Sequence, residues 1–144
     1  MIEQDTIKLL RECDSGVKMG VSSIDEVLGY VKCNQLKKYL QDCKEKHEKL
    51  DEELQELLDR YQDEGKNPNP FVKGMSWMKT NIKLVMEESD ETIADLITDG
   101  CNMGVKSLSR YLNQYKAADE SSKNICKKLI QLEEKLAQQM REFL

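Results

Sequence analysis

The sequence predicts an all-α protein built as a bundle of four long helices, and three observations carry that prediction. Charged residues make up 34% of the 144 residues and aromatic residues 6%, with only two prolines, a composition typical of helical bundles. Apolar residues recur at alternating intervals of three and four along most of the chain, as on the buried face of a bundle helix. The phrase Gly-x-x-Met-Gly-Val-x-Ser-Ile/Leu occurs at residues 16–24 and again 84 residues later, at 100–108, which indicates two copies of one supersecondary unit.

The first copy belongs to a predicted helical hairpin at residues 4–62. Its first helix is expected at 4–31, with Asp5 or Thr6 as the N-cap, and its second at 34–62. Gly65 is the predicted C-terminal cap, and the prolines at 68 and 70 prevent the helix from continuing. The apolar stripes are Ile7, Leu10, Val17, Val21, Ile24, Leu28 and Val31 in the first helix, and Leu36, Leu40, Cys43, Leu50, Leu54, Leu57 and Tyr61 in the second.

A long crossover, residues 63–89, is expected to join this hairpin to the next and to contain an extra amphipathic helix at 71–86. Ser89, followed by two acidic residues, predicts the start of a new helix. The apolar phase also permits one unbroken helix over 71–115. Such a helix would be ~68 Å long at 1.5 Å per residue, too long for this domain unless it is exchanged between subunits.

The second predicted hairpin spans residues 90–144, with helices at 90–115 and 119–143. An offset of 84 places Asp14 on Thr98, and an offset of 86 places His47 on Glu133. We therefore expect a single domain, residues 1–144, made of two repeated hairpins.

Two similar hairpins joined by a long, partly helical crossover resemble the ferritin-like four-helix bundle. The residues Ser89-Asp90, Ile93-Ala94-Asp95 and Gly100-Cys101-Asn102-Met103-Gly104 resemble an uncharacterised bacterial ferritin-like family, a domain of unknown function. This resemblance covers nearly the whole chain. It implies the bundle fold, with the second and third helices parallel, and it implies no established activity.

Ferritin-like oxidases hold two metal ions with a Glu on each of two helices and a Glu-x-x-His motif on each of the other two. His47 fills one histidine position here, but Lys44 stands three residues before it. The equivalent position on the last helix is Glu133, and Ile130 stands three residues before that. Because the full ligand set is absent, di-metal oxidase chemistry is not expected.

Four polar residues still interrupt the apolar stripes at equivalent positions, one on each helix: Asp14, His47, Thr98 and Glu133. We expect a buried polar layer, with an Asp–His pair and a Thr–Glu pair that fix the register of the helices. A second interpretation places some of them at the solvated edge of the stripe. A third is a mononuclear site for zinc, iron or manganese formed by Asp14, His47 and Glu133, although the favoured expectation is that no cofactor is bound.

Small residues recur on the first and third helices: Gly16, Gly20 and Ser23, then Gly100, Gly104 and Ser107. A glycine inside a helix costs ~1 kcal/mol relative to alanine, so a compensating contact is expected. The prediction is a close backbone approach between these two helices. The alternative is a groove kept open for a small ligand or a partner helix.

The remaining features exclude several classes of protein. The net charge of −5 with both signs interspersed argues against nucleic acid or a membrane surface as the main ligand. The acidic start of the chain and the absence of a long apolar stretch argue against export and a membrane span. Five cysteines without a C-x-x-C motif are typical of reduced, mostly buried thiols, so a cytoplasmic location is expected.

The sequence therefore predicts a non-enzymatic helical bundle that acts through binding or self-association, as a homodimer or with another protein. One alternative is a metal-binding redox or storage protein with a degenerate ferritin-type site. Another is a small-ligand carrier with a pocket between the first and third helices.

Overall fold

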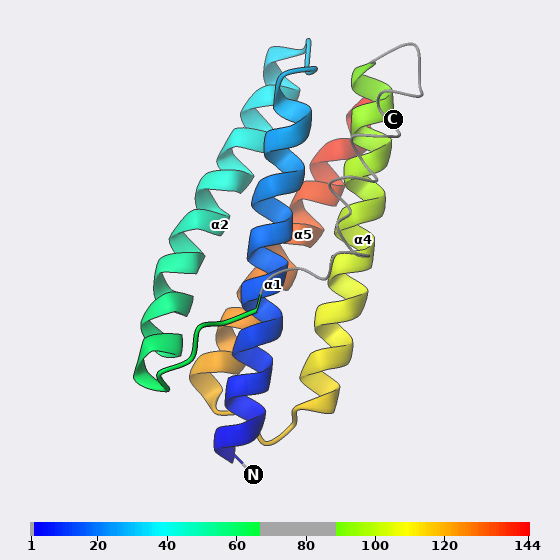
Figure 1. The fold of residues 1–144 in the computed structure, drawn as a ribbon. Helices are drawn as coiled ribbons and strands as arrows, with labels where there is room; N and C mark the ends of the chain where they lie inside the picture. Colours follow the sequence, from blue (N-terminus) through cyan, green and yellow to red (C-terminus); the bar gives the residue numbers. More distant parts are fainter. Residues whose placement is uncertain (1, 67–88) are drawn as a thin grey trace.

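The computed structural model describes residues 2–66 and 89–144, which form four long helices (Figure 1). The helices are α1 (Ile2–Leu28), α2 (Asn34–Arg60), α4 (Asp90–Gln114) and α5 (Glu120–Met140), and a 3₁₀ turn, η2 (Arg141–Phe143), ends the chain. No strand occurs in these two ranges. The prediction of an all-α bundle with four long helices is confirmed, while the extra helix predicted at 71–86 lies outside the described residues.

The helices form two hairpins that pack side by side (Figure 1). Helix α1 packs against α2 and α4, and α5 packs against α2 and α4. At one end, the backbone N–H groups of Lys32 and Cys33, between α1 and α2, donate to Asp90 at the start of α4, both at 2.9 Å. Helices α2 and α4 therefore begin at the same end of the bundle and run in the same direction.

Ser89 starts α4 with a side-chain cap. Its backbone is extended (φ −108°, ψ 154°), and its hydroxyl oxygen accepts a hydrogen bond from the N–H of Thr92 at 3.1 Å. This geometry confirms the predicted helix start at Ser89. Because the backbone of Ser89 is extended and not helical, the alternative of one unbroken helix over 71–115 is wrong. Asp119 caps α5 in the same way, through the N–H of Ser122 at 2.9 Å.

The predicted N-caps of the first helix are wrong. Helix α1 already begins at Ile2, so Asp5 and Thr6 lie inside it. Their side chains instead accept hydrogen bonds from the turn between α4 and α5, where Asp5 bonds the N–H of Ala117 at 3.0 Å and Thr6 that of Asp119 at 2.8 Å. These two side chains thus connect the first turns of α1 to the turn between α4 and α5.

The predicted C-cap of α2 is also wrong. Gln62, with φ 54°, takes the left-handed conformation after the helix, and the N–H of Asp63 returns to the carbonyl of Leu58 at 3.0 Å. This is the Schellman arrangement, which glycine usually provides. Gly65 also has a positive φ, 81°, but it lies farther along and serves a contact described below.

The apolar core consists of two clusters, one toward each end of the bundle. The cluster near the start of α2 and α4 contains Ile24, Val27, Leu36, Leu40, Cys43, Ile93, Ala94, Leu96, Ile97, Cys101, Leu136 and Met140. The cluster at the other end contains Leu9, Leu10, Cys13, Val17, Leu50, Leu54, Leu58, Leu108, Ala118, Ile125, Cys126 and Leu129. All five cysteines are free, and four of them are buried.

Candidate functional site

Where the two apolar clusters meet, a buried histidine pairs with a glutamate. The side chain of His47, from α2, is 1% exposed, and its Nε2 lies 2.8 Å from Oε1 of Glu133, from α5. The other ring nitrogen, Nδ1, lies 2.8 Å from the carbonyl oxygen of Cys43. Because a carbonyl oxygen only accepts hydrogen bonds, Nδ1 carries a proton, and Nε2 is left to face the carboxylate.

The surroundings of His47 favour its charged form. Burial alone would lower its pKa, but the hydrogen bonds with Cys43 and Glu133 and the charge of Glu133 outweigh that effect and raise the pKa to about 10. Burial, together with the same carboxylate, raises the pKa of the nearby Cys101 thiol, which hydrogen-bonds to Glu133. At neutral pH the centre of the bundle therefore contains an imidazolium–carboxylate pair beside a protonated thiol.

Glycines on the other two helices make room for this pair. A Cβ on Gly20 of α1 would lie 2.8 Å from Nε2 of His47, which is closer than real Cβ atoms approach other atoms. A Cβ on Gly104 of α4 would lie 3.5 Å from Oε2 of Glu133, at ordinary contact distance. His47 and Glu133, from α2 and α5, thus fill this level of the bundle, and Gly20 and Gly104, from α1 and α4, leave room for them.

The predicted close approach of the two glycine stripes therefore needs correction. Gly20 and Gly104 face a polar pair, and Gly16 faces Leu129 of α5, 3.3 Å from its would-be Cβ. Gly100 has open space around it, and Ser107 is exposed, while Ser23 is partly buried. Space for side chains of α2 and α5 explains the inner glycines better than contact between the backbones of α1 and α4.

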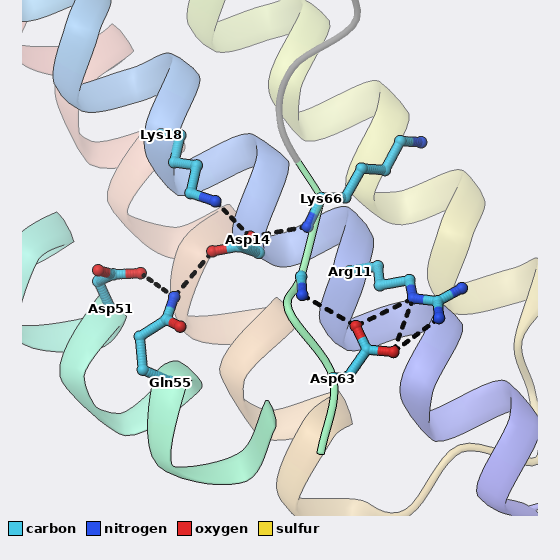
Figure 2. A network of polar contacts seen from close by, with 8 residues as sticks. Arg11, Asp14, Lys18, Asp51, Gln55, Asp63 and Lys66 are labelled. Carbon is cyan, nitrogen blue, oxygen red and sulfur yellow. Dashed lines mark hydrogen bonds and ion pairs between the residues drawn. The ribbon is translucent and has the colours of Figure 1, made fainter. Parts of the chain in front are cut away.

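Asp14 is fully buried but has other partners (Figure 2). Its carboxylate accepts hydrogen bonds from the ammonium group of Lys18 at 2.7 Å, from Nε2 of Gln55 at 2.9 Å and from the backbone N–H of Lys66 at 2.9 Å. Any Cβ on Gly65 would collide with this carboxylate. Gly65 is therefore required both for its positive φ and for the close approach of residues 63–66 to α1.

A second ion pair holds the same loop (Figure 2). The guanidinium group of Arg11 donates to both carboxylate oxygens of Asp63, with the shortest contact at 2.6 Å. The hydrogen bond from Arg11 lowers the pKa of Asp63, helped by the N–H of Gly65. Lys66 also pairs with Glu12 at 2.6 Å, so this end of the loop is fixed to one side of α1 at several points.

The predicted pairing of the polar residues is wrong, although Asp14 and His47 are buried and Glu133 and Thr98 are partly buried. His47 pairs with Glu133 rather than with Asp14, and Thr98 donates to the carbonyl of Ala94 within its own helix at 2.7 Å. Asp14, His47 and Glu133 do not converge on one point. Among residues 2–66 and 89–144, no group of three or more His, Cys, Asp and Glu side chains is arranged to hold a metal ion.

A feature that sequence reasoning missed is a basic groove between α2 and α5. Its rim carries Lys46 and Lys49 from α2 and Lys128 and Lys135 from α5, and its floor includes Leu50 and Leu132. The hollow measures about 390 Å³, near the lower end of the range for ligand pockets. A smaller hollow continues it toward Lys38 and shares Lys46, Leu132 and Lys135.

The groove is basic because the bundle brings together lysines that are far apart in the sequence. On each helix alone these lysines alternate with acidic residues and look like an ordinary solvated face. The alignment of Lys49 with Lys135 at an offset of 86 was the available signal, but it becomes informative only once α2 and α5 are known to be neighbours.

Comparison of the chain with family models, curated proteins and solved structures found no match. Within the described ranges, none of the helices combines the length and the apolar character needed to cross a membrane.

We expect opposite effects from two glycine-to-alanine substitutions. Gly20→Ala should destabilise the protein by roughly 1–3 kcal/mol, because the new methyl group must displace a buried, ion-paired ring. Gly100→Ala should stabilise it by roughly 0.5–1 kcal/mol, because the site is open and alanine favours the helix. Urea unfolding of both variants beside wild type measures the difference, and equal effects would contradict the role assigned to Gly20.

The His47–Glu133 pair should also make stability depend on pH. The folded-state pKa of about 10 exceeds the unfolded value of roughly 6.5. The stabilisation is therefore complete below about pH 6.5 and is lost as pH rises toward the folded pKa, by at most roughly 1.4 kcal/mol per pH unit.

Urea unfolding between about pH 6.5 and 7.5, about one unit below the usual thiol pKa of about 8.5, checks this slope against Glu133→Gln. The variant should show a much flatter profile, because its histidine has lost the carboxylate. Parallel profiles for wild type and variant would show that the pair does not carry the pH dependence.

Proposed function

We propose that the protein is a ferritin-like bundle without a catalytic role, and that it binds an acidic protein segment in the groove between α2 and α5. Two antiparallel hairpins, with α2 and α4 running in the same direction, support the ferritin-like assignment. The assignment concerns the fold, and the function rests on the groove.

The single observation that carries the proposal is the concentration of lysines at the groove, of which only Lys128 forms an ion pair within the described residues. Four lysines and one acidic residue, Glu53, line it in a chain whose net charge is −5. Glu53 approaches Lys128 at 3.4 Å, whereas Lys46 and Lys135 form no ion pair with any described residue. Contact with Lys46 lowers the pKa of Lys135, as expected for two ammonium groups that repel each other. Carboxylates placed between them would relieve that repulsion.

The chemistry of the groove favours an acidic protein over a nucleic acid. Its cationic groups are all lysines, and no arginine or aromatic ring lines the main hollow. Single-stranded nucleic acids are usually held by stacking on aromatic rings and arginine planes as well as by charge. Leu50 and Leu132 offer instead an apolar floor for side chains of a partner, as in grooves that accept amphipathic helices.

The buried polar groups support a binding role rather than chemistry inside the bundle. His47 uses both ring nitrogens and Asp14 uses both carboxylate oxygens in internal hydrogen bonds. Neither side chain is placed to exchange a proton with a substrate. Their arrangement is that of groups satisfied within the fold.

A defined peptide tests the proposal. The probe is a fluorescein-labelled amphipathic helix of about 16 residues, with glutamates flanking a row of leucines, and the matched peptide carries glutamines for the glutamates. Fluorescence anisotropy at low salt should show binding of the acidic peptide to wild type. Binding to K46E/K135E should be weaker by about tenfold or more, since two charge pairs are reversed.

Lys37→Glu is the matched control, because Lys37 is exposed on α2 but does not line the groove. It should bind the acidic peptide as wild type does. Equal binding of the glutamine peptide, equal loss in the control, or tighter binding of a 20-nucleotide RNA than of the acidic peptide would each overturn the proposal.

A further inference from the structure

Helix α4 carries an acidic row that matches the groove in charge. Glu91, Asp95 and Asp99 are all exposed and lie four residues apart, so they follow one another along the same face of the helix. None of the three forms an ion pair with another residue in the described part of the chain. The row ends at Met103, which is 63% exposed and is one of the two large apolar side chains most exposed in that part.

The row also matches the groove in spacing. Leu132 and Lys135 are three residues apart on α5, or ~5 Å along the helix axis, and Asp99 and Met103 are four residues apart on α4, or ~6 Å. The groove combines lysines on its rim with leucines on its floor. The row combines carboxylates with one protruding apolar side chain, which is the complement of that arrangement.

We infer that the α2–α5 groove binds the acidic row of α4 from a second copy of this chain, with Met103 placed over Leu50 and Leu132. The inference rests on the proposed function, because it names the acidic segment that the groove accepts. The carboxylates of Asp95 and Asp99 then face Lys46 and Lys135. They neutralise two ammonium groups that repel each other in the single molecule.

The groove and the row lie on different helices, so the contact is head-to-tail. In such a contact one molecule keeps a free groove and the other keeps a free acidic row. Further copies can therefore add at both ends, which produces either a closed ring or an open chain. Association should therefore grow with protein concentration beyond the dimer. It should weaken at high salt, because exposed charges are screened over distances of about 10 Å at 0.1 M.

Two charge-reversal variants test the contact. K46E/K135E reverses the charge of two groove lysines and keeps the row, whereas D95K/D99K reverses the charge of two carboxylates in the row and keeps the groove. In sedimentation velocity at low salt, wild type should associate and each variant alone should stay monomeric. An equimolar mixture of the two variants should form mixed complexes, because each supplies the surface that the other has lost.

Two further variants make the test specific. Met103→Ala should weaken the association of wild type by about tenfold, through loss of the apolar contact. Lys37→Glu, outside the groove, should associate as wild type does. Circular dichroism checks that all variants are folded, which is expected because every changed side chain is on the surface.

The outcomes separate this inference from the proposed function. Monomeric wild type at about 1 mM and low salt overturns the inference, and the proposed function stands if the acidic peptide still binds. Association that survives in both variants, or variants that fail to complement each other, also overturns the inference. Failure of the acidic peptide to bind overturns the proposed function, whatever the oligomeric state.

Discussion

The ion pair between His47 and Glu133 determines how the four helices meet at the middle of the bundle. It joins α2 to α5, and it occupies space that Gly20 of α1 and Gly104 of α4 leave open. Two helix-interior glycines cost about 1 kcal/mol each relative to alanine. Removing one partner from a buried pair costs roughly 3–5 kcal/mol. The loss of helix stability at the two glycines is therefore smaller than the cost of breaking the charge pair for which they leave room.

The same pair divides the core and fixes its register. On each helix the residues before and after this level belong to different apolar clusters, as Cys43 and Leu50 do on either side of His47. Sliding α2 past α5 by one turn would place leucines opposite the charged groups. A buried polar pair is weak evidence for stability but does specify register. Asp14 performs the corresponding task for the loop, since it holds Lys66 against α1 and leaves no room for a side chain at residue 65.

The sequence is sufficient to predict the helices but not the partners of their polar residues. Periodicity and the capping residue Ser89 locate the helices because both signals are local. The stripe position of His47 shows that it is buried, yet it does not show which neighbouring helix the ring faces. The predicted partner was Asp14, because it occupies the equivalent position in the stripe of the first helix. Only the packing of α2 against α5 selects Glu133.

The capping contacts and the basic groove could not be predicted from the sequence, because both depend on residues that are distant along the chain. Asp5 and Thr6 have side chains suited to capping, but the groups they cap belong to a turn more than 100 residues away. Gln62 takes a conformation that glycine usually adopts, so no residue type marks the end of α2. The groove consists of lysines from two helices that become neighbours only in the folded bundle. In the sequence, each set of lysines belongs to a helix face that alternates in charge and is typical of a solvated surface.

The most direct test of the central ion pair is nitrogen NMR of the His47 ring. His47 is the single histidine of the chain, so its signals are unambiguous. At about pH 8.5 both ring nitrogens should be protonated, and the Glu133→Gln variant should lose one of these protons at the same pH. A wild-type ring that is neutral at pH 8.5 and titrates near its ordinary pKa of about 6.5 would contradict the account.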